Sequence, residues 1–306
     1  MNAEDYVEAV RDLVNDPGGS GYSQSQILRH VSNYAETFFA RARCANEEIF
    51  TVFVPSLLSE SDFVADASNP AYAYALFDNH VVTNITGAWM RRGNSREILR
   101  HVNARGGNYY TGESSSGDYD YNAYSATQYD VVGNRFELYG GIPGAFDVEV
   151  SYERIPPALF VATILLADVD GSGNARISIA HATNPTYGKM ERVPGRYIGT
   201  RIQSISGGIE TIREVMEHTV TATETTFVIR GAAVELATGT KFATIPALPE
   251  DFHHLLALGG ACQAAGVRGA SKLYSMLLNQ RDDAMRQAIV LLEQRLSEPR
   301  YVQDTD

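Results

Sequence analysis

Apolar side chains recur at helical spacing at both ends of this chain, and the pattern changes in the middle. Near the N-terminus, Val7, Val10 and Val14 lie three or four residues apart, which is the spacing of one helix face. From residue 50 to about residue 247, short runs of β-branched and aromatic residues alternate with Gly, Asn, Asp and Pro, which is typical of strands and turns. We therefore predict an α+β protein, with a helical bundle formed by the two ends and a large central antiparallel β region.

Two helices are predicted in residues 1–46. The first covers residues 4–15 and ends at Asp16-Pro17-Gly18-Gly19. Ser23 and Gln26 have the spacing of a capping box, in which each side chain bonds the backbone amide of the other residue. The second helix then runs to about residue 44, with an apolar stripe of Ile27, Val31, Tyr34, Ala35, Phe38 and Phe39.

Helix returns in residues 247–298. Pro249 suits the first helical position, because its missing N–H would have no partner there. Gly259-Gly260 and Gly266 are expected to weaken or break this helix. A longer helix is predicted from residue 270 to residue 297, with its core side formed by Leu273, Leu277, Ala284, Ala288, Leu291 and Leu292. The predicted core shared by both ends comprises Val10, Ile27, Val31, Phe38, Phe252, Leu256, Leu277 and Leu292.

The strands of the centre are predicted from alternation and turn residues at 136–139, 147–152, 161–166, 176–180, 196–204 and 225–230. We expect the first two to be joined by a turn at residues 140–144, and the next two by a turn at residues 168–174. The sequence of residues 209–218 is compatible with either a helix or a strand. Residues 96–102 have the composition of a short helix.

The charge pattern argues against tight nucleic-acid binding. The formal net charge is -12, and the only lysines are Lys189, Lys241 and Lys272. Binding to phosphates needs clustered basic residues, whereas the densest basic point here is Arg91-Arg92, which we interpret as solvated surface. No apolar run approaches the roughly 20 residues of a membrane span, and residues 1–6 are polar, so no membrane contact is expected.

Individual residues of reactive types favour structural interpretations. Asp168, Asp170 and Ser172 resemble the start of a calcium loop, but position twelve would be Ile179, so we interpret them as a turn. The adjacent His253 and His254 point about 100° apart on a helix and cannot share one metal. Single histidines at positions 30, 80, 101, 181 and 218 are expected to be surface or satisfied core residues.

Cys44 and Cys262 are expected to be small buried thiols, and their pairing stays open. No nucleophile elbow, phosphate loop or dinucleotide fingerprint occurs, so we predict a non-catalytic protein that needs no cofactor. A hydrolase with scattered catalytic residues stays open as a third hypothesis, because triads converge from distant positions.

Residues 108–129 are rich in Tyr, Gly, Ser and Asn, the composition of binding loops. Two interpretations stay open: a partly mobile surface loop, or a loop that orders against a neighbouring subunit or partner. In the second case the contact residues would be Tyr109, Tyr110, Tyr119, Tyr121 and Tyr124.

The order of motifs resembles that of the adaptor proteins in the head-to-tail connector of tailed bacteriophages. Residues 6–19 and 22–35 are similar to the family's short helix, its D-P-G-G break and its [WY]-S-x-x-x-[IL]-L helix. Residues 129–156 are similar to a strand pair that ends in Y-x-x-x-P, and residues 245–256 to the late L-P-x-x-[FY]-H-x-x-L helix. The likeness covers about half of the chain. Residues 160–246 depart from it and look like an inserted β module that follows a central β region at 47–159.

The resemblance implies a structural virion protein at the head–tail junction, assembled in the host cytoplasm. It implies a ring of twelve copies that docks beneath the portal protein, joins a downstream tail or nozzle protein, and lets genomic DNA pass without specific binding. An extended tail at residues 299–306 would order on assembly. Its contact with the portal or a neighbouring subunit would involve Glu298, Pro299, Arg300, Tyr301, Val302 and Gln303.

An alternative function is a β-rich receptor- or glycan-binding virion protein. The Tyr-rich loop and the predicted β module are the features that suggest it. A glycan-binding signal without portal contact would favour this alternative.

Overall fold

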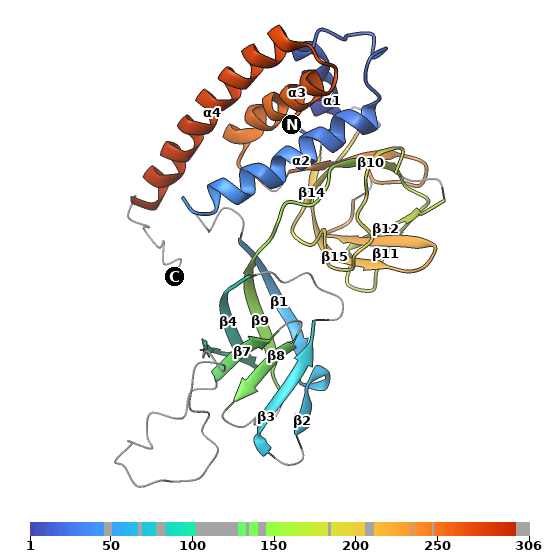
Figure 1. Cartoon of the computed structure of the whole chain (residues 1–306). Coiled ribbons are helices and arrows are strands. Elements are labelled where there is room, and N and C mark those ends of the chain that lie inside the picture. Colours follow the sequence, from blue (N-terminus) through green and yellow to red (C-terminus); the bar gives the residue numbers. More distant parts are fainter. Residues whose placement is uncertain are drawn as a thin grey trace. The chain divides into compact units, whose positions relative to one another are not determined.

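A computed structural model describes residues 1–45, 51–66, 69–77, 84–101, 128–132, 135–139, 145–182, 185–205, 211–233, 235–246 and 248–297. The chain divides into two compact units (Figure 1). Unit 1 contains residues 1–50 and 155–306, and unit 2 contains residues 51–154. Helices lie at both ends and a largely antiparallel β region lies between them, so the predicted α+β class is confirmed.

Four α-helices form the bundle of unit 1: α1 (Ala3–Leu13), α2 (Gln24–Ala42), α3 (His253–Val267) and α4 (Ser271–Ser297). The capping box predicted for α2 is confirmed, because the amide of Gln26 donates to Ser23 Oγ (3.2 Å) and the amide of Ser23 donates to Gln26 Oε1 (2.9 Å). α3 begins after a 3-10 turn, η5 (Glu250–Phe252), so Pro249 caps that turn rather than starting the helix.

α3 packs against α1, α2 and α4 (Figure 1). It runs without interruption through Gly259 and Gly260, so a break there is wrong, but it ends at Val267, directly after Gly266, and α4 begins at Ser271. A Cβ on Gly259 would lie 2.0 Å from the Tyr34 ring, and one on Gly260 would lie 2.6 Å from Val31 Cγ2. The glycines are therefore present because α2 and α3 approach too closely for larger residues.

The remainder of unit 1 is a sheet with the order β11-β12-β16-β15-β14-β17-β10-β13. Its strands are β10 (Phe160–Thr163), β11 (Leu166–Val169), β12 (Ala175–Ala180), β13 (Tyr187–Gly188), β14 (Arg201–Ser204), β15 (Ile212–Val220), β16 (Glu224–Ile229) and β17 (Lys241–Ile245). Between β10 and β11, Ile164 bonds Thr240 beside β17, whereas Leu165 bonds Ser178 of β12. Because β10 and β11 are consecutive, this bend joins the two sides of the sheet and closes it around a core.

This closed sheet belongs to the same unit as the helices. Leu159, Val161, Tyr187 and Ala243 are buried in the bundle core. Hydrogen bonds also join the sheet region to the helical bundle: Asn2 Nδ2 donates to Gln203 Oε1 (2.9 Å), and the amide of Leu159 donates to Ser32 Oγ (3.0 Å). Residues 160–246 are therefore packed onto the bundle.

Unit 2 contains two sheets. One has the order β1-β9-β4-β5, with β1 (Thr51–Ser59), β9 (Asp147–Glu153), β4 (Asn84–Arg92) and β5 (Ser95–Ile98). The other has the order β2-β3-β8-β7-β6, with β2 (Val64–Asp66), β3 (Asn69–Leu76), β8 (Arg135–Tyr139), β7 (Gln128–Val132) and β6 (Arg100–His101). A 3-10 turn, η2 (Glu60–Asp62), separates β1 from β2. The Phe63 ring contacts both Phe136 of β8 and Phe146 beside β9, so aromatic packing joins the two sheets.

Several predicted strands need correction. The strands at residues 136–139 and 147–152 exist but belong to different sheets, because distant strands pair with each of them. The hairpin partner of β12 is β11, not residues 161–166, and only residues 201–204 of the predicted strand at 196–204 are extended. Residues 209–218, left open, are described from residue 211 onward and contribute to strand β15. Residues 96–102 were expected to be helical, but the described part forms β5 and β6. Pairing with β4 and β7 there overrides local propensity.

Candidate functional site

The eight residues predicted for the shared core lie together in the bundle. All are buried and belong to one hydrophobic cluster that contains residues from both ends of the chain: Val10, Ile27, Val31, Phe38, Phe252, Leu256, Leu277 and Leu292. Leu291 was expected to face the core but is 47% exposed. α4 packs mainly against α3, so the opposite side of α4 is left to the solvent.

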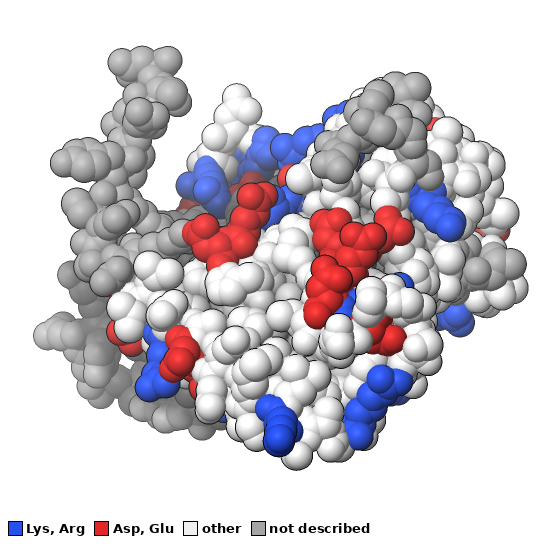
Figure 2. Space-filling view, turned by 90° about the horizontal axis from the view of Figure 1, so that it is seen from above, with Lys and Arg blue, Asp and Glu red and all other residues white. Residues whose placement is uncertain are grey.

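The outer side of α4 exposes large apolar side chains. Met276 is 49% exposed and Val290 is 50% exposed, and Val267 at the end of α3 is 75% exposed. The outer side of α1 is acidic, since Asp5, Glu8 and Asp12 are exposed at helical spacing. The face of the molecule seen in Figure 2 carries separate acidic clusters with Lys and Arg side chains scattered between them.

Both predicted partner-contact segments lie outside the described residues. They are the Tyr-rich loop (Tyr109, Tyr110, Tyr119, Tyr121 and Tyr124) and the tail (Glu298, Pro299, Arg300, Tyr301, Val302 and Gln303).

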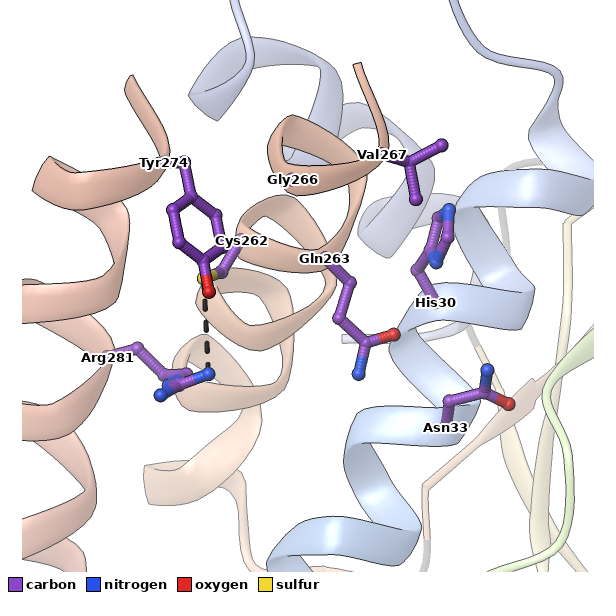
Figure 3. Close-up of a pocket in the computed structure, with 8 residues that line it drawn as sticks. All are labelled: His30, Asn33, Cys262, Gln263, Gly266, Val267, Tyr274 and Arg281. Atoms are coloured by element: carbon purple, nitrogen blue, oxygen red, sulfur yellow. Dashed lines mark hydrogen bonds between the residues drawn. The ribbon is translucent and has the colours of Figure 1, made fainter. Parts of the chain in front are cut away.

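A solvent-open groove of about 460 Å³ lies between α2 and α4, with α3 as its floor (Figure 3). Its lining residues are His30, Asn33, Cys262, Gln263, Gly266, Val267, Tyr274 and Arg281. No motif predicted this groove, because it is formed by residues from three helices that are far apart in the sequence.

The groove has hydrogen-bonding groups but lacks an activated nucleophile. Burial raises the pKa of the Cys262 thiol, which keeps it protonated. Arg281 Nη1 lies 4.0 Å from Cys262 Sγ, and its Nη2 donates to Asp282 Oδ1 (2.6 Å). Figure 3 shows Cys262 on the α4 side of α3 and His30 on α2. Burial also lowers the pKa of His30, so its imidazole is neutral. The groove therefore presents a protonated thiol, a neutral imidazole and the guanidinium of Arg281, which is paired with Asp282.

The expected burial of both cysteines is only half right. Cys262 is buried, but Cys44 is exposed because α2 ends at Ala42, before it. Both are free thiols.

Asp170 Oδ1 accepts from the amides of Ser172 and Asn174 (both 2.8 Å). The hydrogen bond from the Asn174 amide is the largest contribution that lowers the pKa of Asp170. Its carboxylate therefore holds the β11–β12 turn, in agreement with the turn interpretation.

The adjacent histidines of α3 differ in environment. His253 is buried, with Nδ1 at 2.8 Å from the Met1 amine and Nε2 at 3.2 Å from the Leu248 carbonyl oxygen, whereas His254 is exposed. Burial, followed by the charge of the Met1 amine, lowers the pKa of His253 to about 4.

Within the described part of the chain, no group of three or more His, Cys, Asp or Glu residues has metal-binding geometry. No described helix is long and apolar enough to cross a membrane.

Unit 2 contains a polar cluster that the sequence analysis missed. Arg96 Cζ lies 4.3 Å from the centroid of the Trp89 ring, and Arg96 Nε lies 2.6 Å from Glu149 Oε2. Ala88 and Val150 alternate with these residues along β4 and β9 and are buried, so Trp89 and Glu149 occupy the opposite face of the sheet. Only the register of β4 and β9 reveals this cluster, because it places Trp89 opposite Glu149, and the sequence does not specify that register.

Comparison of this chain with protein-family models and with curated proteins gives no match. The functional proposal therefore depends on the motifs and on the geometry of the described residues.

Proposed function

We propose that this chain is a structural subunit of the head-to-tail connector of a tailed bacteriophage. In this role it forms an adaptor ring that docks beneath the portal, joins it to the tail and continues the DNA channel. The observation that carries the proposal is the bundle core, because the helices that resemble the adaptor motifs come from opposite ends of the chain and bury one another. The motifs at residues 6–35 and 245–256 thus belong to one compact unit, whereas the strand-pair motif at residues 129–156 lies mainly in unit 2.

Ring formation requires two different patches on each subunit, which meet head to tail. The bundle offers two surfaces of different character. The exposed apolar residues Met276, Val290 and Leu291 on α4 form one surface, and Asp5 and Asp12 on α1 belong to the other. We assign α4 to subunit contact, because burial of apolar surface is the main driving force of association. The net charge of -12 supports a channel along which DNA slides without being held.

The test is the mass and shape of the assembly, measured by mass photometry and negative-stain imaging, with and without the portal ring. We expect closed rings that stack on the portal. Val290→Asp is expected to weaken ring formation, since it places a charge in the contact. Asn94→Asp adds the same charge at an exposed turn of unit 2, outside the α4 surface, and is the matched control. A protein that stays monomeric at high concentration, with the portal present, would contradict the proposal.

The polar cluster of unit 2 favours a second candidate, a glycan-binding virion protein. An indole beside a guanidinium and a carboxylate combines apolar surface with hydrogen-bonding groups, as small-molecule sites do. Glycan-array binding that is lost in Trp89→Ala, and kept in the control Tyr274→Ala, would favour this candidate over the connector subunit.

A further inference from the structure

Residues 190–200 cover one edge of the closed sheet. One side of strand β15 pairs with β16. On its other side, residues 212–214 pair with β14, and the part from Val215 onward is covered by residues 190–200. The amide of Gly199 donates to the carbonyl oxygen of Val215 (2.7 Å), and the amide of Gly195 donates to that of His218 (2.9 Å). Residues 190–200, which we call the cover, therefore occupy a strand edge that would otherwise be open to pairing.

The cover also inserts side chains into the core of the closed sheet. Met190 and Tyr197 belong to that core cluster. The Tyr197 hydroxyl donates to the carbonyl oxygen of Ala158 (3.0 Å) and accepts from the amide of Glu191 (3.0 Å). Its ring lies against His218 of β15 at a centroid distance of 5.1 Å. The cover and His218 thus share one buried contact.

His218 is an unusual residue for this position. It is 3% exposed, and its ring lies between Tyr197 and Phe227, whose centroid is 4.9 Å away. Neither ring nitrogen has a well-formed hydrogen bond with the described residues, and the polar group that acts on the ring is the Val193 carbonyl of the cover. A neutral imidazole tolerates this environment at a cost. A protonated one does not, because a buried charge without an anionic partner is strongly disfavoured.

We propose that the cover is a conformational device that opens when His218 takes up a proton. The closed form holds His218 neutral, whereas the open form exposes it to water. Opening breaks the hydrogen bonds that the amides of Gly199 and Gly195 donate to the carbonyl oxygens of Val215 and His218. This inference does not depend on the proposed connector role.

The charged residues on the elements that pack near His218 do not offset the effect of burial on its pKa. Charged or titratable groups lie on the cover (Glu191, Arg192, Arg196 and Tyr197), on β15 (Arg213, Glu214 and Glu217), on β16 (Glu224), on β12 (Arg176) and on β14 (Arg201). None of them has a resolved effect on the pKa of His218. Burial lowers this pKa to about 4, and the Val193 carbonyl opposes the effect only in part. Glu191 is bound to Arg196 Nε at 2.5 Å.

The direction follows from the two pKa values. A histidine in the open form titrates near 6.5, so the open form binds more protons than the closed form between about pH 6.5 and pH 4. The closed form is fully favoured above pH 6.5 and loses its advantage as the pH falls. The population of the open form is expected to rise about 100-fold from pH 7 to pH 4.

Hydrogen exchange of the intact protein tests this inference. Protection factors, which remove the intrinsic pH dependence of exchange, are measured at pH 7 and pH 4. We expect the amides of Gly195 and Gly199 to lose about 100-fold protection, while the amide of Ala175, bonded to Gly231 elsewhere in the sheet, keeps its protection.

His218→Phe is expected to abolish the loss, because it keeps an aromatic ring without a titrating group. His181→Phe is the matched control in the same sheet, since His181 bonds Thr225 and is expected to leave the loss unchanged. Equal loss in His218→Phe, or loss spread over the whole sheet, would overturn the proposal. If His218→Phe does not fold, NMR titration of the wild-type His218 ring decides: its midpoint must coincide with the shifts of the Gly195 and Gly199 amides.

Discussion

Substitution of Gly259 by alanine tests the packing of α2 against α3. The new methyl group would lie 2.0 Å from Cδ1 of Tyr34 and 2.4 Å from Cε1. Atoms in non-bonded contact need about 3.5 Å or more. The Tyr34 ring is buried and cannot swing into solvent, so the two helices must separate.

The expected magnitude follows from two opposing effects. Overpacking of a core costs roughly 1–3 kcal/mol, and a clash with an aromatic ring held between two helices belongs at the upper end of that range. Alanine favours the helix over glycine by about 0.8–1 kcal/mol. We therefore expect Gly259→Ala to lower the free energy of unfolding by about 2 kcal/mol. For a unit of this size, that corresponds to a melting temperature lower by about 4–8 °C.

The assay is thermal unfolding followed by circular dichroism and calorimetry. Gly18→Ala is the control, since a Cβ there meets nothing within 4 Å. In a double-mutant cycle with Tyr34→Ala, most of the cost of Gly259→Ala is expected to disappear, because the clashing ring is gone. A Gly259→Ala variant as stable as the wild type, or about 1 kcal/mol more stable, would refute the close-packing argument and leave only helix propensity.

Three further predictions concern other parts of the structure. Ser23→Ala removes the N-cap of α2 and should lower the free energy of unfolding by about 1 kcal/mol in urea titration. Burial lowers the pKa of His253 to about 4, so its stabilising effect is complete above pH 6.5 and falls by up to about 3 kcal/mol as the pH drops toward 4; urea midpoints at pH 7 and pH 4.5 should differ less in His253→Leu. Arg96→Ala should change the emission of Trp89, the only tryptophan, because the guanidinium leaves the indole ring; an unchanged spectrum would contradict that contact.

Local signals in the sequence were sufficient for the helical ends. The capping box at Ser23 and the apolar stripe of α2 are read from residues three and four apart, and both are present in the structure. The same periodicity identified Val10, Phe38 and Leu292 as core residues. Such features depend on neighbours along the chain, so no knowledge of the tertiary structure was needed to find them.

Tertiary structure alone decided the features that join distant residues. Gly259 looks like a helix breaker until Tyr34 is placed against it. β8 and β9 have the alternation of strands, but alternation does not specify which strand pairs with which, and they belong to different sheets. The burial of His218 likewise depends on Tyr197 and on the closure of the sheet. Periodicity and capping are local, whereas close approach and strand pairing depend on which distant surfaces meet, and that is settled only when the chain is folded.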